Sequence, residues 1–145
     1  MRIDGRWISE PDGGVRPLIR AKVQDPSGQF VEVEFLVDSG ADQTVLGAMA
    51  NGMLNLDPVS TDLRLGGAGG MAEARGVSAR LLFVKSDQRP FAINTECFVF
   101  EEENELETCI LGRDVLNLFT VIFDYNNRLV CLLAPNHAYS IQGPQ

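Results

Sequence analysis

The stretch FLVDSGADQTVL, residues 35–46, places a single acidic side chain, Asp38, directly after an apolar run. Ser39 and Gly40 follow it, and such an Asp-Ser-Gly tripeptide is either an ordinary turn or a loop that presents a carboxylate for chemistry. Other catalytic groups are scarce, because the single histidine, His137, lies in a polar tail and the three cysteines include no CxxC pair. Catalysis by this chain would therefore use carboxylates, and we expect neither a metal ion nor a cofactor.

Size and composition suit one small globular domain. The chain has 145 residues, of which 45% are apolar and 22% charged, and its net charge is −8. No apolar run approaches the roughly 20 residues of a membrane helix, and the first residues lack the apolar segment of a signal peptide. We therefore expect a cytoplasmic protein without a membrane segment. The absence of basic clusters argues against nucleic acid as a partner.

Strand patterns dominate the elements that must position Asp38. Short apolar or β-branched runs predict strands at 15–23, 30–37, 62–67, 79–84, 96–100, 108–111, 119–124 and 128–134. The run FVEVEF alternates apolar and acidic residues, as a half-buried strand should. In YNNR, we expect Asn126 and Asn127 to form a two-residue turn between two strands.

Helical signals are weaker. Residues 112–119 could form about two turns, and residues 45–54 one short segment. The predicted fold class is mostly β, a small closed β-barrel or sandwich with one short helix on the C-terminal side. Both ends read as appendages, which gives an N-terminal leader segment over 1–14, a domain over 15–134 and a polar C-terminal tail over 135–145.

Four motifs, in order, resemble those of the retropepsins, the retroviral-type aspartic proteases. VRPLI (15–19) is similar to the early segment beside the partner's active site, and FLVDSGAD (35–42) to the active-site strand and loop. LGGAGG (65–70) resembles the glycine-tipped flap, and CILGRDVL (109–116) the short helix that packs behind the catalytic loop. The resemblance covers 15–134 and implies a single-domain, homodimeric aspartic endopeptidase with a retropepsin-type barrel.

The resemblance implies that two Asp38 side chains act together. As is known for aspartic proteases, two carboxylates about 3 Å apart cannot both ionise, so one acts as general base and the other as general acid. This chain has one Asp-Ser-Gly, and the second carboxylate would come from a second copy across a twofold axis. In the viral enzymes the chain ends interleave at the dimer interface. Here both ends are longer and differ in composition, so the sequence alone does not define how the dimer closes.

Further roles follow from the resemblance. Ser39 and Gly40 would support the catalytic loop, and Arg113 and Asp42 would pair beside the site, joined by Arg16 from the other subunit. The glycine tip, which includes Gly70, would open for a peptide or protein substrate and close over it. Val45 is an expected pocket wall, and the residues expected to bind substrate are Ala41, Asp42, Gly66, Gly67, Ala68, Gly69 and Ile110.

Other readings stay open. A catalytically silent dimer of the same fold could serve as a peptide-binding or scaffold module, and a monomeric acidic β domain could use the Asp-Ser-Gly only as a turn. The acidic run EEENELE (101–107) is either a solvated loop or a groove border that favours basic substrate side chains.

Overall fold

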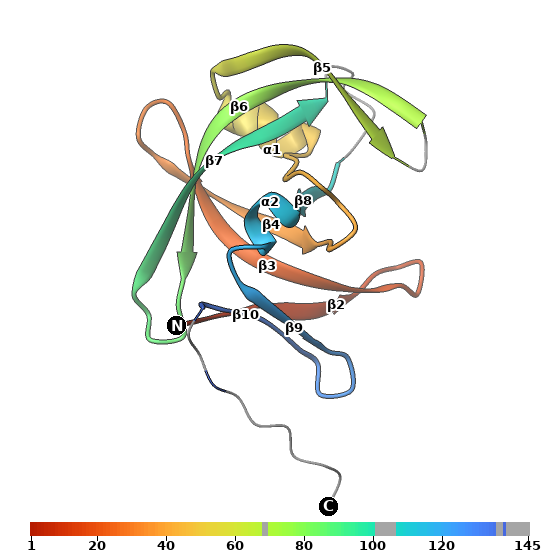
Figure 1. Cartoon of the computed structure of the whole chain (residues 1–145), viewed down its shortest axis with the longest axis vertical. Coiled ribbons are helices and arrows are strands. Elements are labelled where there is room, and N and C mark those ends of the chain that lie inside the picture. The colour runs from red at the N-terminus through yellow and green to blue at the C-terminus, as the bar shows by residue number, and fades with distance from the viewer. Residues whose placement is uncertain (68–69, 101–106, 136–137, 139–145) are drawn as a thin grey trace, which may run out of the picture.

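The computed structural model describes residues 1–67, 70–100, 107–135 and 138. These residues form two β-sheets and two short helices (Figure 1). The strands are β1 (Arg2–Asp4), β2 (Arg6–Ser9), β3 (Val15–Gln24), β4 (Phe30–Val37), β5 (Pro58–Gly67), β6 (Gly70–Val84), β7 (Pro90–Phe100), β8 (Cys109–Leu111), β9 (Thr120–Asp124) and β10 (Leu129–Leu133). The helices are α1 (Ala48–Leu54) and α2 (Arg113–Leu116). Each of the eight predicted strands is confirmed; β4 has the predicted bounds and the other seven have shifted ends.

The larger sheet has seven strands in the order β5-β6-β3-β4-β8, with β2 paired to β3 and β7 paired to β6. Its strand pairs are antiparallel except β4 with β8, which run parallel. No closed barrel is detected among the described strands, so the mostly β class is confirmed and its closure is not. The parallel pair matters most for function, because it sets the ends of β4 and β8 side by side.

The smaller sheet has three strands in the order β1-β10-β9. The sequence suggested that residues 1–14 are a leader segment outside the domain, but β1 pairs with β10 and its Ile3 side chain is only 1% exposed. The next strand, β2, pairs with β3. The N-terminal residues therefore supply buried surface and strand pairing to the folded body.

The turn between β9 and β10 is longer than the two residues that we expected. Four residues, 125–128, connect the strands, and the positive φ, 55°, belongs to Arg128. The Asp124 carboxylate accepts hydrogen bonds from the backbone and side-chain nitrogens of Asn127, and the Arg128 guanidinium lies 4.6 Å from the centre of the Tyr125 ring. Side-chain bonds that the strand pattern does not encode thus lengthen this turn.

Two helices form where the predicted fold class had one. Helix α2 is shorter than residues 112–119, and α1 lies within the weaker segment 45–54. Helix α1 is followed by its C-cap residue, Asn55, which has a left-handed conformation (φ 47°) and whose N–H donates to the Asn51 carbonyl. Among the described residues, no helix has the length and apolar character required to cross a membrane.

One core joins the sheets and both helices. Strand β4 follows the predicted alternation, since Val33, Phe35 and Val37 are buried while Glu32 and Glu34 point outward. The three cysteines are buried and unpaired, and burial raises the pKa of the Cys97 thiol. The core thus holds β4, whose C-terminal end leads into the Asp-Ser-Gly loop.

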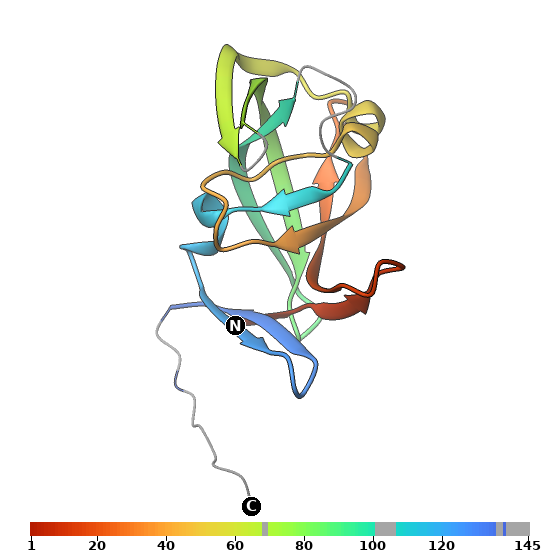
Figure 2. The same ribbon diagram turned by 90° about the vertical axis from the view of Figure 1, so that its right-hand side faces the viewer.

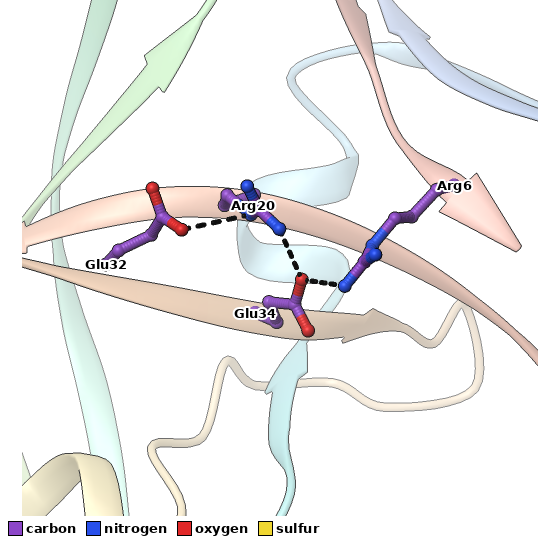
Figure 3. A network of polar contacts seen from close by, with 4 residues as sticks. All are labelled: Arg6, Arg20, Glu32 and Glu34. Carbon is purple, nitrogen blue, oxygen red and sulfur yellow. Dashed lines mark hydrogen bonds and ion pairs between the residues drawn. The ribbon is translucent and has the colours of Figure 1, made fainter. Parts of the chain in front are cut away.

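A network of charged side chains covers the outer face of β2, β3 and β4 (Figure 3). The Glu34 carboxylate accepts hydrogen bonds from Arg20, at 3.0 Å, and from Arg6, and Arg20 also pairs with Glu32 at 3.2 Å. Burial alone would raise the pKa of Glu34, but the bonds from the two guanidinium groups outweigh it and lower that pKa below its ordinary value. The network links the N-terminal strand β2 to the strand that carries Asp38.

Candidate active site

Asp38 is the first residue after β4, and its backbone position is fixed by β8. Val37 lies opposite Leu111 in the parallel pair, and the Asp38 N–H donates to the Leu111 carbonyl at 3.2 Å. The apolar residues before it are buried in the core, whereas Asp38 itself is half-buried. The strand therefore holds the carboxylate at the border between core and solvent.

The Asp38 side chain is oriented by its own loop. The Gly40 N–H donates to the Asp38 Oδ1 atom at 2.8 Å, and the Ala41 N–H donates to the Asp38 carbonyl at 3.2 Å. A Cβ atom on residue 40 would lie 3.1 Å from the same Oδ1 atom. Glycine at this position therefore keeps the space in which the carboxylate bends back to the loop.

The far end of the loop is anchored by Thr44, which is fully buried. Its hydroxyl accepts a hydrogen bond from the Gly112 N–H at 3.1 Å and donates one to the Asp114 Oδ1 atom at 2.8 Å. The backbones approach closely here, because a Cβ atom on Gly112 would lie 2.4 Å from the carbonyl carbon and oxygen of Gln43. Sequence reasoning singled out neither Thr44 nor Asp114.

The first turn of α2 completes the anchor. The Arg113 N–H donates to the Ala41 carbonyl at 2.9 Å, and the Asp114 N–H to the Asp42 carbonyl at 3.2 Å. The Arg113 and Asp42 side chains form an ion pair with both groups largely exposed. Arg113 and Asp42 are thus brought together by an ion pair, and their role beside the active site stays a prediction.

A cleft of about 880 Å³ lies between this loop and the β5–β6 hairpin. The predicted site residues on its lining are Asp38, Gly40, Ala41, Asp42, Gly66, Gly67 and Ile110, together with Val45 and Gly70. Ser39 is exposed and is not part of the lining. Segments separated by more than 60 residues in the sequence therefore meet around Asp38.

Sequence reasoning missed six lining residues: Gln43, Arg64, Leu65, Met71, Ala72 and Phe100. Leu65 is the first residue of the glycine-rich motif, Gln43, Arg64 and Met71 directly adjoin a quoted motif, and Ala72 is one position further, so proximity in sequence could have revealed these five. Phe100 comes from the end of β7 and carries no local signal. With Leu65, Met71 and Phe100 added to Val45 and Ile110, apolar side chains make up much of the cleft wall.

The β5–β6 hairpin forms the other side of the cleft. Gly66 pairs with Met71 and Gly67 with Gly70, whose φ of 113° favours glycine. The Met71 side chain lies against Gly66, where a Cβ atom would be 2.9 Å from its sulfur. Two predicted substrate-binding residues, Ala68 and Gly69, lie outside the described residues.

The remaining expectations concern Arg16, the acidic run and metal binding. Arg16 lies in β3 and forms an ion pair with Asp12 of its own chain at 3.3 Å, so its role toward a partner subunit stays a prediction. Residues 101–106 of the acidic run lie outside the described part of the chain. Among the described residues, no group of three or more His, Cys, Asp or Glu side chains could hold a metal ion.

Known proteins share this sequence pattern and fold. The family model described as aspartyl protease matches residues 19–115, which is more than half of the chain. No curated protein matches the chain. The solved EIAV protease, complexed with the inhibitor HBY-793, is 24% identical, with a TM-score of 0.50 over 76% of this chain and 92% of that one. A retropepsin-like aspartic protease from Rickettsia conorii is 22% identical, with a TM-score of 0.51 over 91% and 88% of the two chains. The chain therefore belongs to the aspartyl protease family and has the retropepsin-like fold.

Proposed function

We propose that this protein is a homodimeric aspartic endopeptidase whose catalytic pair is Asp38 and Asp38 of the partner subunit. The observation that carries the proposal is the placement of Asp38, which a buried strand and a backbone N–H hold on the lining of an 880 Å³ cleft. The match to the aspartyl protease family supports the same chemistry.

The lining of the cleft supports the proposal that a second chain supplies the other carboxylate. Asp42 is the other carboxylate on it, and that group already accepts a hydrogen bond from Arg113. Among the described lining residues, Asp38 therefore has no free carboxylate to share a proton with. A second copy supplies one across a twofold axis.

Hydrolysis by such a pair needs no covalent bond between the enzyme and the substrate. Asp38 of one subunit takes a proton from a water molecule as its oxygen attacks the scissile carbonyl carbon. The protonated Asp38 of the partner subunit donates its proton to the carbonyl oxygen. When the C–N bond of the tetrahedral intermediate breaks, the first Asp38 donates its proton to the leaving amine. Asp38 of the partner subunit takes a proton back from one of the two hydroxyl groups of the intermediate, so the carboxyl product forms and the pair again holds one proton.

The geometry suits these roles. The Gly40 N–H occupies Oδ1 of Asp38, and no described residue donates to Oδ2, which leaves that atom for the water or the partner. Val45, Phe100 and Ile110 offer apolar wall surface, which favours an extended peptide with apolar side chains beside the cut.

The test compares the parent with Asp38→Asn and with a control, Asp57→Asn, whose side chain is exposed and outside the cleft. Each protein is incubated with a diverse peptide mixture between pH 4 and 7, with and without a statine-type inhibitor, and cuts are read by mass spectrometry. We expect Asp38→Asn to lower cleavage by about 10²- to 10⁴-fold and Asp57→Asn to leave it unchanged. If the parent protein is a dimer and cleaves none of the peptides in the mixture, the result would support the catalytically silent scaffold instead.

A further inference from the structure

A second pocket lies outside the cleft. The β3–β4 turn at residues 24–26, the segment after α1 at 56–57, β6 at 78–80 and Asn94 of β7 meet around it. Its volume is about 230 Å³, below the roughly 300–1,000 Å³ of pockets that hold drug-sized ligands. The pocket therefore suits a molecule as small as a free amino acid.

The pocket is separate from the cleft. None of its described lining residues belongs to the lining around Asp38. In Figure 1 the β3–β4 turn lies at the upper left and the free end of the β5–β6 hairpin at the upper right. Figure 2 shows the β3–β4 turn and α1 at one end of the molecule and the β9–β10 hairpin at the other. A ligand in this pocket would thus occupy a site of its own.

Hydrogen-bond donors line the pocket on its sheet side. Arg80 of β6 lies opposite Asn94 of β7, so the two side chains share one face of the sheet, and Ser78 lies on that face two positions earlier. Among the described residues, these three side chains have no hydrogen-bond or ion-pair partner. Glu96, opposite Ser78, already accepts a bond from Ser60. A guanidinium beside an amide and a hydroxyl suits a carboxylate, which can accept two parallel bonds from arginine.

A carboxylate faces the pocket from the β3–β4 turn. The Ser27 hydroxyl and the Gln29 N–H donate to Oδ1 of Asp25, at 2.7 and 2.9 Å, and no described residue donates to Oδ2. The bond from Ser27 lowers the pKa of Asp25 below its ordinary value of 3.8, so the group is charged at neutral pH. Asp57, which is exposed, adds a second negative charge to the lining. The turn therefore presents a carboxylate oxygen that an ammonium group can use.

Apolar groups complete the lining. Leu56 and Ala79 are only 7% and 3% exposed, and Pro26 follows Asp25 in the turn. The Gln24 side chain donates to the Gly28 carbonyl at 3.1 Å and so helps to hold the turn in place. An apolar side chain of moderate size would find surface to pack against here.

We propose that this pocket binds a free α-amino acid with an apolar side chain. The ammonium group donates to Oδ2 of Asp25, the carboxylate accepts bonds from Arg80, and the side chain packs against Leu56. In the part of the chain that the structure describes, Arg80 pairs with neither Asp25 nor Asp57, so opposite charges line one small pocket without neutralising each other. A zwitterion satisfies both charges, whereas an anion or a cation alone leaves one unpaired. The site goes beyond the proposed function, because no residue of the cleft takes part.

Titration of the isotope-labelled full chain with leucine, followed by amide NMR shifts, tests the site. We expect saturable shifts at residues 24–29, 56–57, 78–80 and 94. Leucine amide lacks the carboxylate and N-acetyl-leucine lacks the ammonium, so each should bind at least about tenfold more weakly. Equal binding of either analogue, shifts centred on the cleft, or no saturation below roughly 10 mM leucine would overturn the site.

A dipeptide separates a free amino acid from a short peptide as the ligand. The two charges of leucyl-leucine stand further apart than those of leucine, and the molecule is about twice as large. We therefore expect leucyl-leucine to bind more weakly than leucine in the same titration. Tighter binding of the dipeptide would overturn the assignment to a free amino acid.

Two substitutions test the charged groups. In Asp25→Asn, the amide oxygen can still accept the bonds within the turn, but the nitrogen that replaces Oδ2 cannot accept a bond from an ammonium group. This variant and Arg80→Gln should each bind leucine at least about tenfold more weakly. The matched controls are Asp87→Asn and Arg89→Gln in the β6–β7 turn outside the pocket, where the Asp87 carboxylate likewise accepts a bond from a turn N–H, at 3.0 Å.

The controls should bind leucine as the parent does, and an equal loss of affinity in controls and pocket variants would overturn the assignment. The amide spectrum also shows whether each variant is folded. If a pocket variant does not fold, the leucine analogues decide with the parent protein alone.

The outcomes separate the two proposals. Asp38→Asn should bind leucine with the affinity of the parent, because the cleft and the pocket share no described residue. A protein that cleaves peptides but binds no leucine overturns the pocket site and retains the proposed function. A protein that binds leucine in the pocket but cleaves nothing retains the site and overturns the proposed function.

Discussion

The two sides of the cleft are built in different ways. Residues 38–44 form a loop whose backbone is bonded to β8 and α2 at Asp38, Ala41 and Asp42, and whose last residue, Thr44, is fully buried. In the β5–β6 hairpin, β5 and residues 70–73 of β6 are exposed or half-buried, and the pairing shifts register between Pro58 and Leu63. Within this shift Asp62 has a φ of 58°.

The difference matches what each side must do. A catalytic carboxylate acts best when its position is set before the substrate arrives. A cover over a cleft must open and close, and segments with few buried contacts and irregular pairing open at low cost. Substitutions that expose this contrast should therefore destabilise the loop side and spare the hairpin side.

The largest loss of stability is expected from Gly112→Ala. Its Cβ atom would lie 2.4 Å from backbone atoms of Gln43, and those atoms cannot rotate away as a side chain could. We expect the free energy of unfolding to fall by about 3 kcal/mol. The control is Gly52→Ala in α1, where nothing lies within 4 Å and alanine should stabilise by about 0.5–1 kcal/mol. Chemical denaturation measures both, and equal effects would contradict the tight contact.

Thr44→Val should have the next largest effect. The valine leaves the Gly112 N–H and the Asp114 Oδ1 atom without their partner, in a site where the other Asp114 oxygen is already buried without one among the described residues. We expect a loss of about 1–3 kcal/mol. The matched control on the hairpin side is Thr61→Val. Among the described residues, the exposed Thr61 hydroxyl bonds to Asp62 alone, so the loss should stay within about 0.5 kcal/mol. Thermal unfolding of the two variants should therefore differ by several degrees, and coincident curves would argue against the anchor.

Gly67→Pro should separate activity from stability. Residue 67 pairs with Gly70 at the exposed end of the hairpin, so losing its N–H should lower the free energy of unfolding by less than about 1 kcal/mol. If the hairpin closes over the substrate, kcat/KM should nevertheless fall by about tenfold or more. Gly67→Ala, which keeps the N–H and has open space around it, is the control. Normal cleavage by the proline variant would mean that this hairpin is only a turn.

The smallest effect is expected at Glu34, on the outer face of the strand that carries Asp38. Hydrogen bonds from Arg20 and Arg6 lower its pKa despite partial burial, so its contribution to stability is present above the ordinary value of 4.5 and is lost as pH falls through the lower, folded value. Glu34→Gln should therefore flatten the loss of stability below pH 4.5. Denaturation midpoints at pH 6 and 3.5 measure this loss, and the control is Glu10→Gln, which removes a carboxylate outside the network. A parent and variant that lose stability in parallel would contradict the role of the network.

Much of the fold could be predicted because burial leaves a local pattern. Alternation in FVEVEF marks a strand with one buried face, and β4 has that face. The Asp-Ser-Gly and glycine-rich motifs pointed to two sides of a cleft because their spacing and order resembled a known family. The ends of elements were harder to predict, as the four-residue turn at 125–128 shows, because side-chain bonds such as those between Asp124 and Asn127 decide them.

By itself, the sequence determined that a strand delivers one carboxylate, Asp38, to a turn, and that a glycine run lies elsewhere in a mostly β chain. Only the tertiary structure decided that Phe100 joins the wall, that Thr44 bonds to Asp114, and that β1 closes its own sheet and leaves β9 at the edge. The physical reason is range. Periodicity records which face of a strand avoids water, whereas the choice of partner depends on how strands distant in sequence cross and which hydrogen-bonding groups they leave unpaired.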